Sequence, residues 1–388
     1  MTIALQYTAE QLAFRAEVRA WMEANVPADP LPTLEGAEGF AAHREWERTL
    51  AKGRWGMVTW PEAYGGRSCN LIEWLIFEEE YYRAAAPARV NQNGIFLLGP
   101  TLMEFGTPEQ KARYLPKMAS GEEIWAQAWS EPQAGSDLAA IRATAVRDGD
   151  DYVLRGHKIW SSRATFADWC FGMFRTEPGS EKHHGISFIL VPLRHPGVRV
   201  RGIPQIHGEM GFAEIFFEDA RVPVGHRLGG EGQGWHIAMA TAGFERGLML
   251  RSPARFQVTA QKLVELYRRL ATSLDPALGA AVAQAWMDAE AYALNTYMTA
   301  SRLMNGGTIG VEASLNKIFW SELDLAMHQA AMSMLGASAE LLPHAPDAED
   351  LGNWLEGWIF SLAGPIYAGT NEIQRNIIAE RLLKLPRG

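Results

Sequence analysis

The periodicity of apolar residues changes twice along the chain, and this constrains the fold more than any other feature. Over about the first 125 residues the apolar positions recur at helical spacing. From Ile141 the apolar runs become short and extended, and beyond Gly234 the helical spacing returns and holds to the end. This order predicts an α+β multidomain protein: an N-terminal all-α domain over 1–124, a middle β-barrel-like domain over 125–233 and a C-terminal four-helix bundle over 234–388.

Capping and turn signals place several elements within this order. Thr8 with Gln11, and Thr107 with Gln110, have the spacing of a capping box, which marks the start of a helix. The glycines of Gly229–Trp235 do not open a βαβ unit, so we interpret them as a hinge and not as a dinucleotide fingerprint. The further elements predicted are a loop over 28–40, helices from about His43 to Lys52 and from Leu71 to Arg83, and two strands flanking the turn Asp148–Asp151.

Composition excludes several classes of function. The 388 residues are 47% hydrophobic, which is ample for a core, and the net charge of −9 includes no basic run of the kind that binds nucleic acid or an anionic membrane. No segment approaches the roughly 18 apolar residues of a membrane span, and the start does not have the pattern of a signal peptide. Two cysteines, Cys69 and Cys170, favour a reducing compartment, so we expect a cytoplasmic protein; no metal site is predicted.

The stretch from Trp129 to Ser162 has the composition of a ligand-binding segment. Gly135 allows the backbone to approach a ligand, and the amide groups around Ser136 can form an anion-binding concavity. An ordinary Ser/Pro/Gly turn is the alternative. The later run Lys158–Ser162 adds an aromatic face and further hydroxyls, which favours the ligand-binding interpretation.

Two long motifs give the chain a resemblance to a known family. The sequence W-S-E-P-Q-A-G-S-D, followed by G-D-D-Y-V-L-R-G-H-K-I-W-S-S, resembles the signature of the acyl-CoA dehydrogenases, and Pro365–Arg375 resembles their C-terminal signature. Pro61–Gly66 and Gly106–Gln110 extend the match over essentially the whole chain. The resemblance implies bound FAD, an acyl-CoA substrate oxidised across Cα–Cβ to the trans-2-enoyl-CoA, transfer of electrons to an electron-transfer flavoprotein, and a tetramer.

The resemblance also assigns roles to individual residues. Thr370 has a simpler alternative as a helix N-cap, and Trp160 as a core residue. The residues expected to contact the flavin are Trp129, Ser130, Gly135, Ser136, Trp160, Ser162, Thr370 and Glu372. Those expected to contact the substrate are Ser136, Arg246, Tyr367 and Gly369.

The catalytic base is where the chain departs from many family members. Abstraction of a thioester Cα proton requires a carboxylate and a polarised carbonyl. Many members carry the carboxylate in Y-E-G-T, but here the second position is Ala368, which offers only its backbone N–H for carbonyl polarisation. Other members carry the base on the first helix of the C-terminal bundle, just before an arginine, and Glu245 precedes Arg246 there. We therefore predict that Glu245 is the base; the alternatives are a structural Glu245–Arg246 pair and Glu372.

The surroundings of Glu245 bear on the substrate. Ala238, Thr241 and Ala242 share its helical face, and their small side chains are expected to leave space for a ligand. These small residues and the placement of the base resemble family members that accept branched or bulky thioesters, including steroid-derived ones.

Segments that family members commonly donate across a subunit interface are absent. An R-x-x-F-G segment and a Gln before Gly-Gly are expected, but 270–279 contains no arginine and 332–337 no Gly-Gly pair. Because a guanidinium is suited to hold a pyrophosphate, we predict that a paralogous subunit completes the site in an α2β2 assembly, with a homotetramer as the alternative. Two other functions remain open: a non-catalytic scaffold subunit, and a flavin monooxygenase or oxidase.

Overall fold

The computed structural model describes residues 6–206, 208–246, 251–270, 275–341, 345–348 and 353–386, with the backbone alone at 244–246. The chain divides into two compact units. One combines Met1–Ala24, Asn70–Ala85 and Arg246–Gly388, and we call it the bundle unit. The other combines Asn25–Cys69 and Ala86–Glu245, and we call it the sheet unit.

The N-terminal helices begin at local capping signals. Both predicted capping boxes are confirmed: the Thr8 and Gln11 pair bonds reciprocally at 3.0 and 3.2 Å, and the Thr107 and Gln110 pair at 3.1 and 3.2 Å. The helices are α1 (Ala9–Asn25), α2 (Ala37–Lys52), α3 (Leu71–Arg83), α4 (Gly99–Phe105) and α5 (Pro108–Ala119). The prediction for α3 is confirmed, whereas the loop predicted to reach residue 40 is wrong, because the helix already begins at Ala37, after Gly36 in extended conformation.

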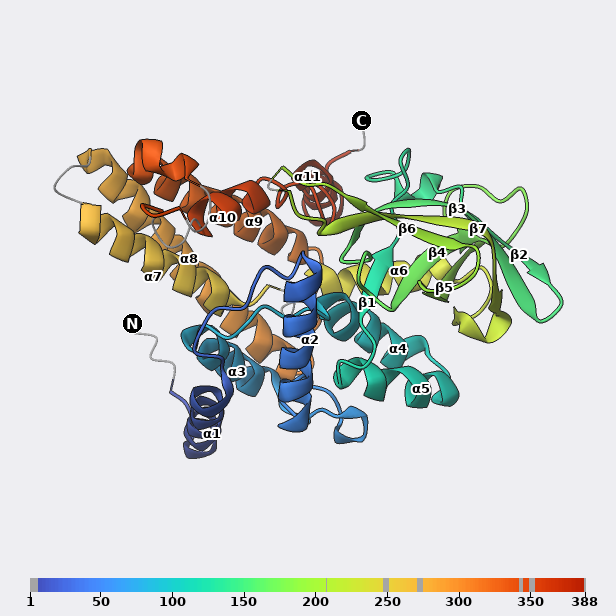
Figure 1. The fold of residues 1–388 in the computed structure, drawn as a ribbon, viewed down its shortest axis with the longest axis horizontal. Helices are drawn as coiled ribbons and strands as arrows, with labels where there is room; N and C mark the ends of the chain where they lie inside the picture. The colour runs from blue at the N-terminus through green and yellow to red at the C-terminus, as the bar shows by residue number, and fades with distance from the viewer. Residues whose placement is uncertain are drawn as a thin grey trace. The chain divides into compact units, whose positions relative to one another are not determined.

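The described residues of the sheet unit form one eight-stranded sheet in the order β6-β7-β3-β2-β4-β5-β8, with β1 pairing parallel to β4 (Figure 1). The predicted turn at Asp148–Asp151 joins β2 to β3. A core of apolar side chains lies against the sheet, including Phe40 of α2 and Phe174 of β4. The strands are β1 (Trp125–Ala128), β2 (Thr144–Asp148), β3 (Asp151–Ser162), β4 (Trp169–Arg175), β5 (Ile186–Pro192), β6 (Val198–Ile203), β7 (Phe212–Pro223) and β8 (Arg227–Leu228).

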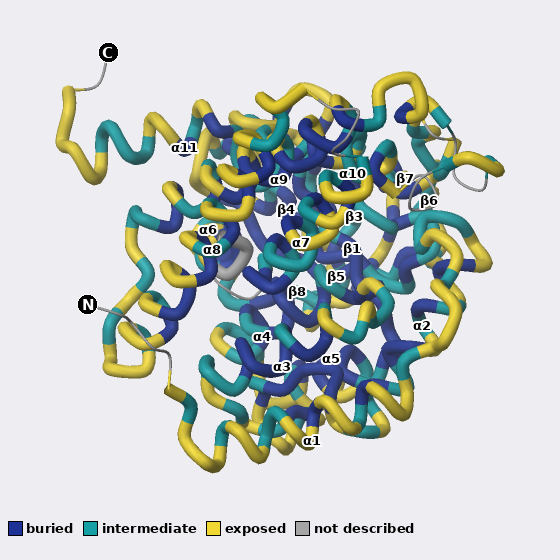
Figure 2. Tube along the Cα trace, turned by 90° about the vertical axis from the view of Figure 1, so that its left-hand side faces the viewer, coloured by how far each residue is buried: buried dark blue, intermediate teal, exposed yellow. Residues whose placement is uncertain are grey.

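The bundle unit is built on long helices whose apolar faces meet in a second core. Helices α7 (Pro253–Leu270), α8 (Pro276–Met304) and α9 (Ala313–Leu335) lie alongside one another (Figure 1) and bury Phe256, Tyr292 and Trp320 between them. Helices α10 (Asn353–Ser361) and α11 (Asn371–Ile377) follow, and α11 continues into a π-helical turn, Ile378–Leu382. Figure 2 shows that the chain beyond this turn is exposed, in contrast to the buried strands of the sheet.

Two N-terminal helices of the bundle unit are joined by ion pairs around the buried Glu80. Arg15 and Arg19 of α1 pair with Glu79 and Glu80 of α3 at 2.6 and 2.8 Å. Tyr297 of α8 also donates a hydrogen bond to Glu79. The N-terminal helical, middle sheet and C-terminal helical architecture predicted from the sequence is confirmed, while its helices are shared between two compact units.

Candidate functional site

A buried ion pair joins the loop of the first motif to strand β3. Lys158 is fully buried, and its Nζ donates to the Glu131 carboxylate at 2.8 Å. The same ammonium donates to the backbone carbonyls of Trp129 at 3.2 Å and Met173 at 2.7 Å. Two of these three hydrogen bonds fix the loop to β3, and the third joins β3 to Met173 of β4.

The Glu131 carboxylate is bonded on both oxygens. It accepts the backbone N–H groups of Arg142 at 2.7 Å and Ala143 at 2.9 Å in addition to the Lys158 ammonium. Burial by itself raises the pKa of this carboxyl, but the Lys158 charge and the hydrogen bonds together hold it below its ordinary value. The Glu131 carboxylate is therefore ionised at neutral pH, whereas burial lowers the pKa of the Lys158 ammonium against the opposing effect of the Glu131 charge. Neither residue was predicted to act at the site, although both lie inside the motifs.

Trp160 leaves the β-ladder and exposes its ring. The pairing of β3 with β7 shifts register between Lys158 and Ser161, and Trp160 has a left-handed φ of 60°. A register shift of this kind re-aims a side chain. The ring is 59% exposed and packs edge-on against Phe212 with centroids 6.2 Å apart. The structure thus excludes the alternative that Trp160 is a core residue within its unit.

The three serine hydroxyls that were predicted to contact a ligand are available to bind one. Ile159 N–H donates to the Ser130 carbonyl at 2.9 Å, which holds the loop beside Trp160. Within the part of the chain that the structure describes, the hydroxyls of Ser130, Ser136 and Ser162 make no hydrogen bond. A Cβ added at Gly135 would meet no atom within 4 Å, so open space adjoins this backbone.

The helix predicted to carry the base is present, but the side chain lies outside the described residues. Helix α6 (Gly234–Arg246) contains Glu245 and Arg246, of which only the backbone is described. Thr241 shares a 2.9 Å hydrogen bond with Thr101 of α4, and Ala238 and Ala242 are buried. Thr241 therefore packs against α4 within the sheet unit, while the space next to the Glu245 side chain lies outside the described residues.

The C-terminal signature forms a turn with unpaired amides. Ala368 and Gly369 both have left-handed φ angles, 58° and 81°. Among the described residues no acceptor bonds the N–H groups of Ala368, Gly369 or Thr370. The Thr370 hydroxyl accepts from Ile373 N–H at 3.2 Å, which confirms its role as N-cap of α11. The left-handed turn therefore presents a row of free donors.

Tyr367 and Glu372 flank this turn. The Tyr367 ring lies 5.9 Å from that of Trp320, with the Arg251 guanidinium over it at 5.3 Å. Its hydroxyl is buried and makes no hydrogen bond with the described chain. Glu372 is exposed. The hydrogen bond from its own backbone N–H lowers the pKa of its carboxyl; desolvation opposes this shift, and the Thr370 hydroxyl adds to it. Tyr367, Ala368, Gly369, Thr370 and Glu372 belong to the bundle unit, and the other predicted residues with described side chains belong to the sheet unit.

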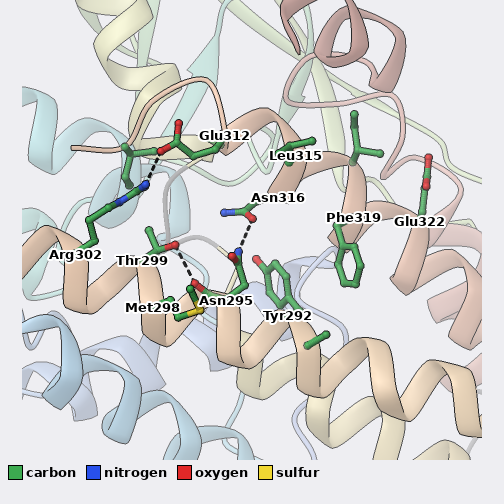
Figure 3. Close-up of a pocket in the computed structure, with 14 residues that line it drawn as sticks. Tyr292, Asn295, Met298, Thr299, Arg302, Glu312, Leu315, Asn316, Phe319 and Glu322 are labelled. Carbon is green, nitrogen blue, oxygen red and sulfur yellow. Dashed lines mark hydrogen bonds and ion pairs between the residues drawn. The ribbon is translucent and has the colours of Figure 1, made fainter. Parts of the chain in front are cut away.

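A pocket of about 710 Å³ opens between α8 and α9 (Figure 3). Tyr292, Met298 and Phe319 supply its apolar walls, and an Asn295–Asn316 hydrogen bond of 2.8 Å crosses it. None of the residues predicted for flavin, substrate or catalysis lines this pocket. Glu322 at its edge bonds Arg375 of α11 at 2.6 Å, so the pocket adjoins the C-terminal signature without containing it.

The described residues contain neither a membrane-spanning helix nor a cluster of metal ligands. None of those helices combines the length and hydropathy that crossing a bilayer demands. No group of three or more His, Cys, Asp or Glu side chains in that part of the chain is arranged to hold a metal ion.

Models of one protein family match the chain along nearly its full length. The acyl-CoA dehydrogenase N-terminal domain matches residues 8–122, the middle domain 126–220 and the C-terminal domain 232–383.

The chain belongs to the acyl-CoA dehydrogenase family.

Individual members of this family are similar over the whole length. Acyl-CoA dehydrogenase IpdE1 of Mycobacterium tuberculosis is 41% identical, with 96% of this chain and 97% of that protein covered. A chain of the solved ChsE4–ChsE5 complex of M. tuberculosis is 31% identical, with 100% of this chain and 100% of that chain covered and a TM-score of 0.85. The structure described as "Tcur3481-Tcur3483 steroid ACAD" is 29% identical over the whole of both chains, with a TM-score of 0.87. The chain is accordingly an acyl-CoA dehydrogenase, an enzyme of the flavoprotein oxidoreductases.

The sheet unit offers features that suit the flavin that the family uses. An exposed indole suits a planar aromatic ring, and unpaired hydroxyls suit its polar edge. Trp160, Ser130 and Ser162 provide these groups, while the open backbone at Gly135 leaves room for a ligand. The residues present therefore fit the group. The Glu131–Lys158 ion pair, which attaches the loop to β3, was not predicted from the sequence. Its only signal there is that a negative residue lies in the first half of the motif and a positive residue in the second half.

Proposed function

We propose that the chain catalyses FAD-dependent α,β-dehydrogenation of an acyl-CoA thioester to the trans-2-enoyl-CoA, with an electron-transfer flavoprotein as acceptor. The observation that carries the proposal is the turn at Ala368. Its N–H has no acceptor within the described chain, although the backbone is held in a left-handed conformation that is unfavourable for alanine. A donor kept free at this expense suits the oxygen of a thioester carbonyl.

Two groups of the protein act on the substrate in this proposal. The Ala368 N–H donates to the thioester oxygen and stabilises the negative charge that develops there as the Cα proton leaves. Glu245 receives that proton on its carboxylate. Because a thioester Cα–H is a weak acid, both contributions are needed in the same step.

The flavin is held by the features described above. FAD, when bound, supplies the two-electron oxidant that removes a hydride from Cβ. Trp129, Ser130, Gly135, Ser136, Trp160, Ser162, Thr370 and Glu372 are the residues we assign to it. Trp160 covers the ring and excludes water, and the free hydroxyls of Ser130 and Ser162 orient the polar edge.

The acyl group is proposed to be bulky and ring-containing, of the steroid-derived class. The similar solved structure Tcur3481-Tcur3483 is described as a "steroid ACAD", which supports this class. Ser136, Arg246, Tyr367 and Gly369 are the residues we assign to the acyl-CoA.

A paralogous subunit is proposed to complete the enzyme as an α2β2 assembly. The chain lacks the arginine and Gly-Gly segments that family members donate to a neighbour's flavin, and a similar solved structure is a complex of two different proteins. The α8–α9 face exposes Met298, Leu315 and Phe319, with Met298 at 70%. Adjacent apolar side chains left exposed on one face of a unit are typical of a surface that another chain covers.

The test of the reaction is anaerobic bleaching of the flavin by a panel of acyl-CoA thioesters. Glu245→Gln is expected to keep FAD and to reduce the bleaching rate about 10²- to 10⁴-fold, the usual effect of losing a general base. Glu231→Gln is the matched control, because this glutamate is an exposed residue paired with Arg227 ahead of the same helix. Unchanged bleaching in Glu245→Gln would remove Glu245 as the base and make Glu372 the next carboxylate to replace.

Expression of the chain alone and with a paralogue tests the assembly. Mass measurement and flavin quantitation should show a flavin-poor species alone and an α2β2 species with tightly held FAD together. A stable homotetramer with one FAD per chain would contradict the heteromer. A colourless protein in both preparations would favour the scaffold subunit, and oxygen consumption that depends on reduced flavin would favour a monooxygenase.

A further inference from the structure

A lysine with no assigned role is buried next to the C-terminal signature. Lys317 lies on α9 and is only 1% exposed. Its Nζ donates to the Asn371 side-chain oxygen at 2.7 Å. An ammonium group taken out of water costs several kcal/mol before its hydrogen bonds offset this, so an apolar residue would serve helix packing better at this position. Helix packing therefore does not explain why a lysine is buried at this position.

Asn371 connects this lysine to the turn that carries the free amides. It is the first residue of α11, directly after Thr370, and is itself buried. Its backbone N–H donates to the Pro365 carbonyl at 2.9 Å, which closes the segment from 365 to 371 into a loop. Ser321 Oγ donates to the same Asn371 oxygen at 3.2 Å. Two donors on α9 therefore hold one end of the loop in place.

A second buried side chain holds the middle of the same loop. Gln374 Nε2 donates to the carbonyls of Gly369 at 3.2 Å and Ala368 at 3.4 Å. The carbonyls of the left-handed turn thus face the protein interior, while their N–H groups have no acceptor in the described chain. Because a left-handed alanine relaxes unless its surroundings over-determine it, the anchors on both sides of the turn are needed to keep it.

We propose that Lys317 is a positioning residue of the dehydrogenation: through Asn371 it fixes the loop over 365–371, so that the Ala368 N–H stays oriented for the thioester carbonyl. This rests on the proposed function of that N–H. Lys317 does not touch the reacting atoms; it acts through the backbone that does. A donor displaced by about 1 Å can lower a rate about 10²-fold, so the anchor matters to catalysis even where the fold survives.

The experiment compares Lys317→Met with Lys262→Met. Lys262 is the matched control because it is an exposed lysine on a helix of the same unit. Hydrogen exchange of the backbone over 366–371 is the readout that needs neither substrate nor flavin. The amides that can report opening are the hydrogen-bonded ones, above all Asn371 N–H, which donates to the Pro365 carbonyl at 2.9 Å. We expect their exchange to be at least about tenfold faster in Lys317→Met and unchanged in Lys262→Met, because losing an anchor opens the loop locally.

Steady-state kinetics of the flavin-loaded assembly give the second readout. Lys317→Met is expected to lower kcat about 10- to 100-fold with KM within about threefold, since the displaced N–H stabilises charge present chiefly in the transition state. Lys262→Met is expected to stay within about threefold of the parent in both constants, because that side chain is exposed. A merely structural lysine would lower the folded fraction without changing kcat per bound flavin.

The outcomes separate this inference from the function on which it rests. Parental protein that no thioester bleaches would contradict the proposed function, while the exchange measurement still decides whether Lys317 anchors the loop. Unchanged exchange over 366–371, or faster exchange with unchanged kcat, would overturn the positioning role. Should Lys317→Met not fold, the double variant Lys317→Met/Asn371→Ala replaces it, because it removes the Asn371 oxygen together with the ammonium group that donates to it.

Discussion

Replacing Lys158 by methionine tests whether the Glu131–Lys158 pair holds the flavin-binding segment together. Methionine keeps the unbranched shape of the side chain and removes its charge. The Glu131 carboxylate, 4% exposed, then has no opposite charge, and the carbonyls of Trp129 and Met173 each lose a donor. The loop that carries Ser130 loses its main attachment to β3.

The expected magnitude follows from the burial of both partners. Removing one partner of a buried ion pair costs about 3–5 kcal/mol, because the other charge stays buried without compensation. The backbone N–H groups of Arg142 and Ala143 still bond Glu131, which places the estimate near the lower end, about 3 kcal/mol. With a urea m-value of about 3 kcal/mol/M, the unfolding midpoint of the sheet unit should fall by roughly 1 M.

The assay follows urea unfolding by hydrogen exchange in peptides of β3, which reports the sheet unit separately from the bundle unit. Arg155→Met is the control, since Arg155 lies three residues earlier on the same strand and pairs with Asp219 at the surface. An exposed pair contributes about 0–1 kcal/mol, so this variant should unfold within about 0.3 M of the parent. FAD retention should fall in Lys158→Met and stay unchanged in Arg155→Met.

The double variant Glu131→Gln/Lys158→Met provides the internal check. It removes both charges, so it should be more stable than Lys158→Met. If Lys158→Met unfolds within about 0.3 M of the parent and retains FAD, the ion pair does not organise the segment and the reasoning is refuted.

Two further predictions concern the same unit. Gly135→Ala should change the free energy of unfolding by less than about 0.5 kcal/mol, because open space adjoins that backbone, but it should weaken FAD binding in a flavin titration. Gly156→Ala should instead destabilise the unit, because the added Cβ would lie 2.4 Å from the Cβ of Ala143 at a residue whose φ is 145°. Stability should also depend on acid: since the folded-state pKa of Glu131 is lowered, its contribution is complete above the ordinary carboxyl pKa of about 4.3 and is lost as the pH falls through the lowered value. Urea midpoints at pH 7, 4 and 3 should show this loss in the parent and less of it in Glu131→Gln; equal pH dependence in both would assign it to other groups.

Local features of the structure could be predicted because their hydrogen bonds join residues close in sequence. The capping boxes at Thr8 and Thr107 and the N-cap at Thr370 each join a side chain to a backbone group three residues away. The turn at Asp148–Asp151 likewise depends on adjacent residues. The order of helical, extended and helical segments was also readable, since burying one face of an element imposes its period on the sequence.

Strand β4 shows where periodicity is insufficient. Trp169–Arg175 is buried along most of its length and pairs with β1, β2 and β5, so its sequence has no alternation that distinguishes a strand. Its assignment required knowledge of its neighbours on both sides.

The sequence by itself determined the element order, the family signatures and the candidate site residues, because these depend on residue type and short spacing. Only the tertiary structure decided which charges are buried and what they hold. Lys158 meets Glu131 across 27 residues and Lys317 meets Asn371 across 54. A lysine in a sequence has no mark that distinguishes a solvated side chain from a buried one, since its desolvation and its partners depend on segments that come together only when the chain has folded.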